Sequence, residues 1–337
     1  MLINKKTNCA IIGFGKMGLV YYNIIKKLNL NLVSVCDLKE SNKKNLKKKD
    51  QKLFTKNFNR VLDNDIDFLI ISSTADCHAS YAKKAILKGI KNILIEKPVV
   101  TSLKDGYELM RLQKKYKTRI CVNHNEFLKN HIKILNEFSK SKKNIGAVNS
   151  IIFTGGNMGY AMNAVHVFDL IVILAKSKIS KVFNLFDTKK TKNPRGRNFF
   201  DFSGRLIGET KNKVNFFIDI SNKQGHGRNI KILYEYGIID IDFLSGKFSY
   251  NIRKKKYLKL PKTRYNTPGE KGSFKFKIAP VKITTLRHVE KFLTNKNYIK
   301  LERAFENVKI LIAASINKKI KLTNLNRIKS KKKFSWA

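Results

Sequence analysis

The sequence predicts an α/β chain in two parts: an N-terminal domain around a parallel sheet and a C-terminal α+β domain with a large, mostly antiparallel open sheet. Three observations support this. Apolar strand-like runs alternate with helical stretches up to about residue 145, as in parallel sheets covered on both faces. Short strand-like runs separated by turns follow. A glycine-rich turn comes directly after the first strand. We expect the domains at residues 1–122 and 123–337.

The elements of the first domain follow one another in a regular order. Strands are expected in NCAIIGFG, LNLVSVCD, IDFLIISST, GIKNILIEKP and TRICVNHN. Helices are expected in KMGLVYYNIIKKLN, from about His78 to Lys88, and in LKDGYELMRLQKKYK. Continuous apolar runs of this length are typical of strands that are buried on both faces.

The second domain is dominated by strands. They are expected in GAVNSIIFTGG, SKVFNLFDT, NFFDFSGRLIG, KVNFFIDISN, NIKILYEYGIIDIDFLSG and KFSYNIRKKKYLKL, with helices from about Ala161 and over about Leu301 to Asn317. One face of this sheet would pack helices, and the other would expose Phe216, Ile218 and Ile220 unless a partner covers them. We therefore expect a homo-oligomer, a dimer or a tetramer, joined through the open sheet.

The turn after the first strand has the spacing G-x-G-x-x-G, at Gly13, Gly15 and Gly18. The spacing alone is a weak signal, but here it follows a strand and opens a helix, as a dinucleotide-binding turn requires. The first glycine then permits the tight turn, the second lets the backbone approach a pyrophosphate, and the third allows close helix–strand packing. A Rossmann domain is therefore expected, with cofactor contacts in this turn at Gly13, Phe14, Gly15, Lys16, Met17 and Gly18.

The acid that ends the second strand indicates which dinucleotide is bound. Asp37 lies 24 residues beyond Gly13, where a carboxylate can accept hydrogen bonds from both hydroxyls of the adenosine ribose. It would repel the 2′-phosphate of NADP, so we expect NAD as the cofactor, with NADP disfavoured. Lys39 lies close enough along the chain to soften that preference.

Two stretches carry candidate catalytic residues. Glu96-Lys97-Pro98 follows the fourth strand, at the carboxyl edge of the sheet where ligands bind in such folds, so Lys97 can donate or accept a proton there. An ordinary surface loop is the alternative. In the helix expected from Ala161, Asn163 and His166 are three residues apart and share a face. A lone helical histidine is more often a core or surface residue, but a polar pair beside two glycines, where the domains join, favours a site.

Other polar residues are weaker candidates. Asn123, His124 and Asn125 end the last strand of the first domain, and we expect them to line the cleft, with His124 as a substrate contact. Three arginines in loop-like segments can bind a phosphate or carboxylate with two parallel hydrogen bonds; they are Arg195, Arg197 and Arg228. A solvated loop charge is the alternative for each of them.

The charge of the chain does not by itself indicate a nucleic-acid partner. The formal net charge is +46, which favours anionic ligands. The lysines are spread along the whole chain, however, and the basic clusters KESNKKNLKKK and RIKSKKKF lack interleaved aromatics for stacking bases. An anionic small substrate accounts for the positive net charge equally well, so specific nucleic-acid binding is not expected.

The remaining composition favours a cytoplasmic protein without a metal or a membrane span. The start of the chain does not have the pattern of a signal peptide. The apolar run around VFDLIVILA is too short to cross a bilayer and contains Asp169. None of the cysteines forms a C-x-x-C pair, so reduced thiols are expected rather than a zinc site; the four are Cys9, Cys36, Cys77 and Cys121.

These segments together resemble the Gfo/Idh/MocA oxidoreductases, the family of glucose–fructose oxidoreductase and inositol dehydrogenase. The resemblance rests on GFGKMG, on SSTADCHASYAKKAILKGIKNILIEKP, and on GG followed by HVFDL, and it extends over essentially the whole chain. It implies that the glycine-turn domain binds NAD(P), with further cofactor contacts at Ser73, Thr74, His78, Glu96 and Lys97. It also implies that Lys97 lies near the nicotinamide and the substrate, and that His166 reaches the reacting hydroxyl.

One position departs from the family pattern. Members commonly have an aspartate four residues before the histidine, where this chain has Met162. Asn163 can orient a hydroxyl but cannot accept its proton, so proton transfer is expected to depend on His166 and Lys97. The form GGNMGYAMNAVHVFDL resembles a branch of the family with asparagine at this place, and this resemblance implies sugars for cell-surface glycans as the substrates.

The expected function is therefore hydride transfer between NAD(P) and the hydroxyl or ketone of a sugar or nucleotide sugar. The alternative is a non-catalytic dinucleotide-binding regulator or scaffold with the same fold. Met162 favours this alternative, whereas the presence of both Lys97 and His166 favours the enzyme.

Overall fold

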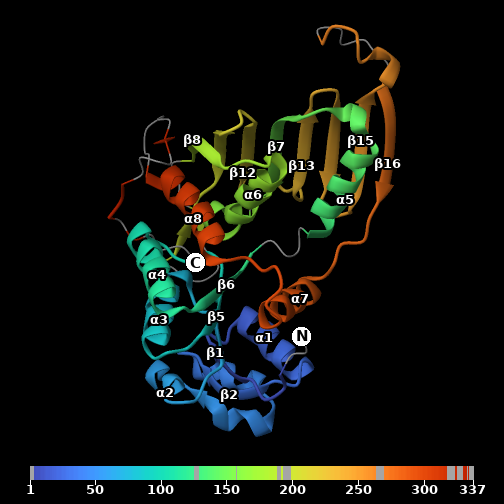
Figure 1. Cartoon of the computed structure of the whole chain (residues 1–337). Coiled ribbons are helices and arrows are strands. Elements are labelled where there is room, and N and C mark those ends of the chain that lie inside the picture. Colours follow the sequence, from blue (N-terminus) through green and yellow to red (C-terminus); the bar gives the residue numbers. More distant parts are fainter. Residues whose placement is uncertain are drawn as a thin grey trace. The chain divides into compact units, whose positions relative to one another are not determined.

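The computed structural model describes residues 4–124, 129–156, 158–187, 191–192, 199–262, 269–316, 323–324, 329–331 and 333 (Figure 1). The chain divides into two compact units: the first comprises residues 1–126, 281–308 and 330–337, and the second comprises 127–280 and 309–329. The helices are α1 Lys16–Lys27, α2 Phe58–Leu62, α3 Ala75–Leu87, α4 Leu103–Tyr116, α5 Lys129–Ser141, α6 Tyr160–Ala175, α7 Val281–Leu293 and α8 Leu301–Ile316.

The strands fall into two groups along the chain. Those of the first unit are β1 Asn8–Ile12, β2 Asn31–Cys36, β3 Phe54–Thr55, β4 Phe68–Ile71, β5 Asn92–Glu96 and β6 Arg119–Asn123. Those of the second unit are β7 Val148–Gly156, β8 Ile179–Phe186, β9 Thr191–Lys192, β10 Phe200–Asp201, β11 Gly204–Thr210, β12 Asn215–Ser221, β13 Asn229–Tyr234, β14 Gly237–Asp242, β15 Lys247–Arg253, β16 Gly269–Lys275 and β17 Thr323–Asn324.

The first unit is the predicted parallel sheet. Its six strands run in the order β3-β2-β1-β4-β5-β6, and every neighbouring pair is parallel. Figure 1 shows α3 and α4 on one side of this sheet and α1 and α7 on the other. Strand order reverses between β1 and β4, so the carboxyl ends of these two strands form the switch point where such folds bind ligands.

Helix α7 is an element of the first unit that the sequence analysis did not predict. It follows the second unit's sheet in the sequence, yet Val289 and Phe292 are fully buried in the core that β1 and α1 share. The Phe292 ring lies 5.6 Å from that of Phe68 in β4. The i, i+3 spacing of these two apolar residues is a helical signal, but only the tertiary structure shows which core they enter.

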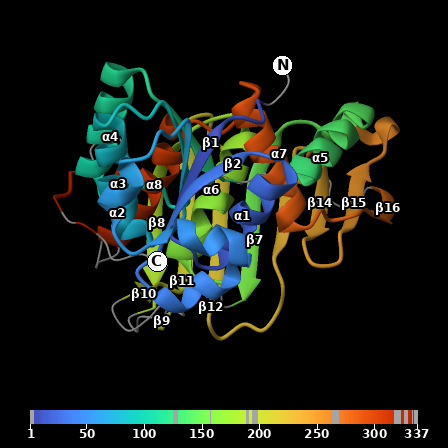
Figure 2. The same cartoon turned by 90° about the horizontal axis from the view of Figure 1, so that it is seen from below.

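The second unit is built on a nine-stranded sheet. The strand order is β16-β15-β14-β13-β7-β12-β11-β8-β17, and the described pairs are antiparallel except for β7 with β12. The predicted mostly antiparallel open sheet is confirmed. Helices α5 and α6 lie along this sheet, α6 at the middle strands and α5 beside β14 to β16 (Figures 1 and 2).

The prediction of which sheet residues are exposed was wrong. Phe216, Ile218 and Ile220 are 2%, 0% and 0% exposed, because they belong to the face of β12 that packs in the core. Period-two alternation shows that the three share a face, but it does not show which face the helices cover. The opposite face carries Phe217, which pairs in register with Ile207 of β11. Three apolar side chains on it are about two-fifths exposed: Leu185 at 40%, Ile207 at 41% and Ile238 at 42%.

Helix α6 explains the apolar run around VFDLIVILA. Twelve of its sixteen residues are buried, as expected for a helix that is apolar almost all round. Among the described residues no helix is both long and apolar enough to cross a membrane.

Candidate functional site

The first candidate site is the glycine turn after β1. Gly13 has a positive φ of +85°, and a Cβ there would lie 2.4 Å from the backbone nitrogen of Ser73, which follows β4. A Cβ on Gly18 would lie 2.2 Å from the carbonyl oxygen of Gly13. The first and third glycines therefore let three backbone segments meet at the switch point.

Gly15 has a different role in the turn. It is the N-cap of α1, with φ −76°, and a Cβ placed there meets no protein atom within 4 Å. Backbone N–H groups in the first turn of a helix lack intrahelical acceptors and attract anions. Because Gly15 has no side chain, a ligand can approach the N-terminus of α1. The pyrophosphate of a dinucleotide is an anion that binds at such a helix N-terminus.

Asp37 lies directly after β2, beside this turn. Its Oδ2 accepts a hydrogen bond from the backbone N–H of Phe14 at 2.6 Å, and its Oδ1 accepts one from Lys39 at 2.8 Å. A carboxylate has about four acceptor positions, so both oxygens retain capacity for ribose hydroxyls. Phe14 contributes its backbone here, since its ring is fully buried and packs edge-on against Tyr22. Lys16 is exposed and Met17 is half-buried.

Hydrogen bonds of His78 connect the predicted cofactor contacts after β4 with the turn that follows β5. His78 in α3 is almost fully buried, with Nδ1 2.9 Å from the carbonyl oxygen of Pro98 and Nε2 3.1 Å from that of Ser73. The imidazole therefore links two loops at the carboxyl edge of the sheet. Thr74 is the N-cap residue of α3. The Lys97-Pro98 peptide bond is cis.

Glu96 is the centre of a buried hydrogen-bond network. Its Oε1 accepts hydrogen bonds from the Tyr21 hydroxyl at 2.5 Å and from Asn123 Nδ2 at 2.7 Å, and its Oε2 lies 3.3 Å from the donating N–H of Lys97. Burial, and then the charge of Glu96, raise the pKa of Tyr21 well above its ordinary value. The network holds the backbone of Lys97 in place, while the residue itself stays half-buried.

Tyr21 was not among the predicted site residues. It lies in α1, 75 positions from Glu96, in an apolar helical pattern that indicates core packing. Asn123 was predicted to line the cleft; in the structure its side chain donates a hydrogen bond to Glu96. His124, predicted as a substrate contact, is 1% exposed. Asn125 lies outside the described residues.

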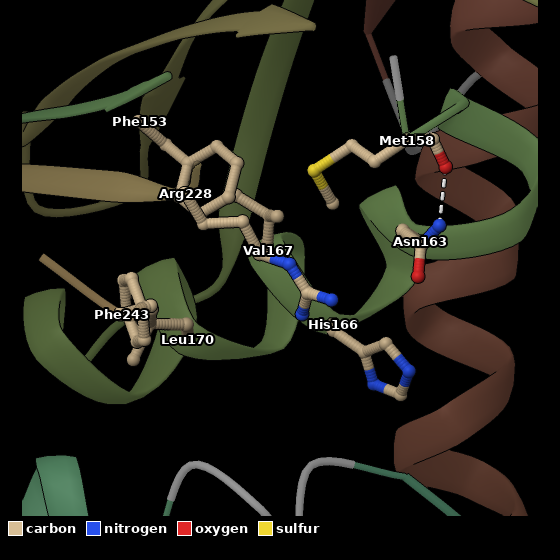
Figure 3. Close-up of a pocket in the computed structure, with 8 residues that line it drawn as sticks. All are labelled: Phe153, Met158, Asn163, His166, Val167, Leu170, Arg228 and Phe243. Atoms are coloured by element: carbon tan, nitrogen blue, oxygen red, sulfur yellow. Dashed lines mark hydrogen bonds between the residues drawn. The ribbon is translucent and has the colours of Figure 1, made fainter. Parts of the chain in front are cut away.

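A second, separate candidate site is a pocket in the second unit (Figure 3). It is lined by Phe153, Met158, Asn163, His166, Val167, Leu170, Arg228 and Phe243. The structure thus brings Asn163 and His166 of α6 to one pocket, as their spacing predicted. His166 is 9% exposed. The pocket also brings in Arg228, while Arg195 and Arg197 lie outside the described residues.

Asn163 is partly committed to the backbone. Its Nδ2 donates a hydrogen bond to the carbonyl oxygen of Met158, shown as a dashed line in Figure 3. The amide therefore keeps its Oδ1, an acceptor, and its second N–H, a donor, for a ligand.

The start of α6 is held by a carboxylate from another strand. Asp201 of β10 is 2% exposed and accepts hydrogen bonds from the backbone of Ala161 at 2.7 Å and of Met162 at 3.2 Å. A Cβ on Gly159 would lie 2.2 Å from this carboxylate. A negative charge at a helix N-terminus is stabilising. Asp201 was missed from the sequence because it caps the helix from 40 residues away.

The four cysteines all lie in the part of the chain that the structure describes. None of the four forms a disulfide bond, and burial raises the pKa of Cys9 to about 12 and that of Cys36 to about 11. These thiols are therefore protonated at neutral pH. The described residues include no cluster of three or more potential metal ligands.

Comparison with known proteins identifies the first unit. Residues 7–124 match the family GFO_IDH_MocA, described as an oxidoreductase family with an NAD-binding Rossmann fold. Fold, glycine turn and family match together define an NAD-binding Rossmann domain. This N-terminal domain belongs to the Gfo/Idh/MocA oxidoreductase family, and the predictions of the family, of the fold and of NAD as the type of cofactor are confirmed.

The relatives and solved structures are more distant. The uncharacterized oxidoreductase YhhX of Escherichia coli (strain K12) is 32% identical over 111 residues, and the match covers about a third of either protein, 32% of each. GenD2 from gentamicin A biosynthesis, crystallised with NAD, has a TM-score of 0.74 at 16% identity and covers 96% of this chain and 97% of its own.

Two further structures share the whole-chain fold. UDP-N-acetylglucosamine 3-dehydrogenase GnnA from Acidithiobacillus ferrooxidans has a TM-score of 0.68 at 14% identity, over 91% of this chain and 96% of its own. A super-repressor mutant of Gal80p from Saccharomyces cerevisiae has a TM-score of 0.73 at 11% identity, over 96% of this chain and 99% of its own. At such identities the likeness establishes the fold alone.

Proposed function

We propose that this protein is an NAD-dependent oxidoreductase that transfers a hydride between the nicotinamide and a hydroxyl or ketone carbon of a sugar or nucleotide sugar. The observation that carries the proposal is the pairing of an open helix N-terminus at Gly15 with the Asp37 carboxylate beside it. The carboxylate favours a free ribose hydroxyl over a 2′-phosphate, and so NAD over NADP. The sugar class is supported by the names of GenD2 and GnnA, which share this fold.

The proton that accompanies the hydride needs its own acceptor. Bound NAD supplies the carbon that takes or gives the hydride. His166 is the general base of the proposal, because a histidine titrates near neutral pH and this one lines a pocket with Asn163. Lys97 stabilises negative charge developing on the substrate oxygen, held through its backbone by the Glu96 network. Asn163 accepts a hydrogen bond from a neighbouring hydroxyl through Oδ1.

A regulator that binds NAD without turnover is the second candidate. Met162 stands where the family commonly has an acid, and Gal80p, named as a transcriptional regulator in one of the matched structures, has the same fold. The retention of both Lys97 and His166 weighs against this candidate, since a scaffold has no need of a proton acceptor and a cation.

One experiment separates the two functions. NADH binding is measured by fluorescence titration, and nicotinamide absorbance is then followed with a panel of free and nucleotide-activated sugars. We expect NADH binding, and turnover of at least one sugar that His166→Asn slows by about 10²–10⁴-fold. NADH binding without turnover on any member of the panel would favour the regulator, whereas absence of NADH binding would overturn both candidates.

We also propose that the protein is a homodimer or homotetramer joined through the face of the second unit's sheet that carries Ile207. The partly exposed Leu185, Ile207 and Ile238 lie on that face, and exposed apolar residues spread over several strands are typical of a covered surface. Light scattering at micromolar concentration is expected to give the mass of an oligomer; a monomeric mass of about 38.9 kDa would contradict this.

A further inference from the structure

A cavity of about 410 Å³ lies within the second unit, among residues that the proposed reaction does not use. Its walls are the C-terminal halves of α5 and α6, the segment that leads into β7, the turn between β11 and β12, and the end of β13. Among the described residues none lines both this cavity and the pocket that contains His166. The volume is in the range of small-molecule binding sites.

The walls of this cavity are held by hydrogen bonds of the protein itself. The N–H of Glu235, next to β13, donates to the carbonyl oxygen of Ala147 at 2.8 Å. Asn212 Nδ2 donates to the carbonyl oxygen of Ala175 at 2.9 Å, which joins the β11–β12 turn to the end of α6. The cavity therefore exists without a ligand, and a ligand does not have to order its walls.

Two lysines line the cavity and have no acceptor. Neither Lys140 nor Lys176 forms an ion pair or a side-chain hydrogen bond with any residue that the structure describes. Among the described lining residues none is acidic. Glu235, which follows the lining residue Tyr234 in the chain, forms an ion pair with Lys262 instead. The described part of the chain thus leaves both positive charges of the cavity unneutralised.

The position of these lysines at the ends of helices does not by itself account for them. Cations near a helix C-terminus stabilise the helix dipole, and α5 and α6 both end at the cavity. The last carbonyl groups of α6, however, already accept hydrogen bonds from protein donors: that of Val172 from the N–H of Ser177 at 3.2 Å, and that of Ala175 from Asn212. The Lys176 ammonium group is therefore available to an acceptor on a ligand.

Neutral donors lie beside the two cations. The hydroxyl groups of Tyr234 and Ser139 are 3.3 Å apart. Burial raises the pKa of Tyr234 above its ordinary value, so its hydroxyl is protonated at neutral pH, and one of the two hydroxyl groups keeps a proton for a ligand. The amide of Asn136 is exposed and makes no hydrogen bond to a described residue. The polar side of the cavity thus offers mainly donors.

The remaining walls are apolar or glycine, and Leu135, Ile145 and Leu174 are among them. Such walls suit the carbon skeleton of a small organic molecule better than a bare ion. A phosphate monoester carries about −1.5 to −2 charges at neutral pH, which matches two lysines, whereas a carboxylate carries one. Lysine binds phosphate as a point charge and does not need the planar geometry that arginine offers to carboxylates.

We infer that this cavity binds a small phosphorylated metabolite of about the size of a sugar phosphate. Lys140 and Lys176 bind its phosphate group, and Tyr234, Ser139 and Asn136 bind its hydroxyl groups. The inference does not depend on the proposed function, because the cavity has its own lining residues.

The first test measures binding by calorimetry with NADH at saturation, so that the glycine turn is occupied. The phosphate esters are glucose 1-phosphate, glucose 6-phosphate, fructose 6-phosphate and glycerol 3-phosphate. Glucose, glucuronate and inorganic phosphate are the comparison ligands. We expect at least one ester to bind about 10- to 100-fold more tightly than each comparison ligand, because hydrogen bonds to charged groups are the stronger ones.

Variants connect this binding with the cavity. The double variant Lys140→Gln, Lys176→Gln is expected to weaken binding of the preferred ester by about 10- to 100-fold. Ala147→Phe places a ring on an exposed lining residue and is expected to block binding. Lys178→Gln, which removes an exposed cation that does not line the cavity, is the matched control and is expected to bind as the unchanged protein does. Thermal unfolding verifies that each variant is folded.

Lysine acylation locates the ligand directly. The protein is treated with an N-hydroxysuccinimide ester, and labelled peptides are quantified by mass spectrometry. The preferred phosphate ester is expected to slow labelling of Lys140 and Lys176 and to leave that of Lys178 unchanged.

The outcomes separate this inference from the proposed function. Binding by none of the esters, equal binding by the double variant, or labelling of Lys140 and Lys176 that the ester does not change would overturn the inference. Inorganic phosphate or glucuronate binding as tightly as the best ester would overturn the assignment to a phosphorylated metabolite. Failure of NADH to bind would overturn the proposed function, whereas protection of the two lysines by a phosphate ester would still support the inference.

Discussion

Substitutions of the glycines in the turn are expected to separate effects on stability from effects on cofactor binding. Gly15→Ala is the change expected to affect cofactor binding alone. A Cβ there meets no protein atom within 4 Å, and the φ of −76° suits alanine. Alanine is a poorer N-cap than glycine but restricts the unfolded chain, so stability is expected to change by less than about 1 kcal/mol. The methyl group occupies the approach of the pyrophosphate. Overpacking of about 1–3 kcal/mol corresponds to a fall in NADH affinity of about 5- to 150-fold.

Gly13→Ala is the matched control. Its Cβ would lie 2.4 Å from the Ser73 backbone at a φ of +85°, so strain and overpacking should cost at least about 2 kcal/mol. The assay is thermal unfolding by intrinsic fluorescence beside NADH titration. We expect Gly13→Ala to lower the melting temperature by about 4–8 °C and Gly15→Ala to leave it nearly unchanged while weakening NADH binding. A Gly15→Ala protein that binds NADH as tightly as the unchanged one would refute the reasoning.

Four further changes test other residues of the two units. Asp37→Ser is expected to narrow or reverse the preference for NADH over NADPH in calorimetry, because the repulsion of a 2′-phosphate is removed; tighter NADPH binding by the unchanged protein would contradict the assignment. His166→Asn is expected to lower kcat on a confirmed substrate by about 10²–10⁴-fold with NADH affinity unchanged, whereas Asn163→Ala should cost only about 0.5–1.5 kcal/mol; full turnover by His166→Asn would place the histidine in the core. Asp201→Ala leaves the backbone N–H groups at the start of α6 without their acceptor, so denaturant unfolding should show a loss of about 1–3 kcal/mol, and unchanged stability would exclude the capping role.

Sequence alone determined much of the first unit, because its signals are local. Continuous apolar runs mark strands buried on both faces, and the glycines at 13, 15 and 18 are required by contacts within one turn. Asp37 follows from its place at the end of β2. The pairing of Asn163 with His166 was also predictable, since residues three apart on a helix share a face whatever the fold around them.

Only the tertiary structure decided the contacts between segments that are far apart in the sequence. Tyr21 and Glu96 are joined across 75 positions, and Asp201 reaches Ala161 across 40. Neither pair has a sequence signal, because a buried tyrosine resembles any core residue and an aspartate in a strand resembles a surface charge. Alternation placed Phe216, Ile218 and Ile220 on one face, but the helices that cover the sheet decided that this face is the buried one. Arg228 lines the His166 pocket because of a tertiary contact as well. The register of β13 against β7, and not the place of Arg228 in the sequence, sets where its side chain begins.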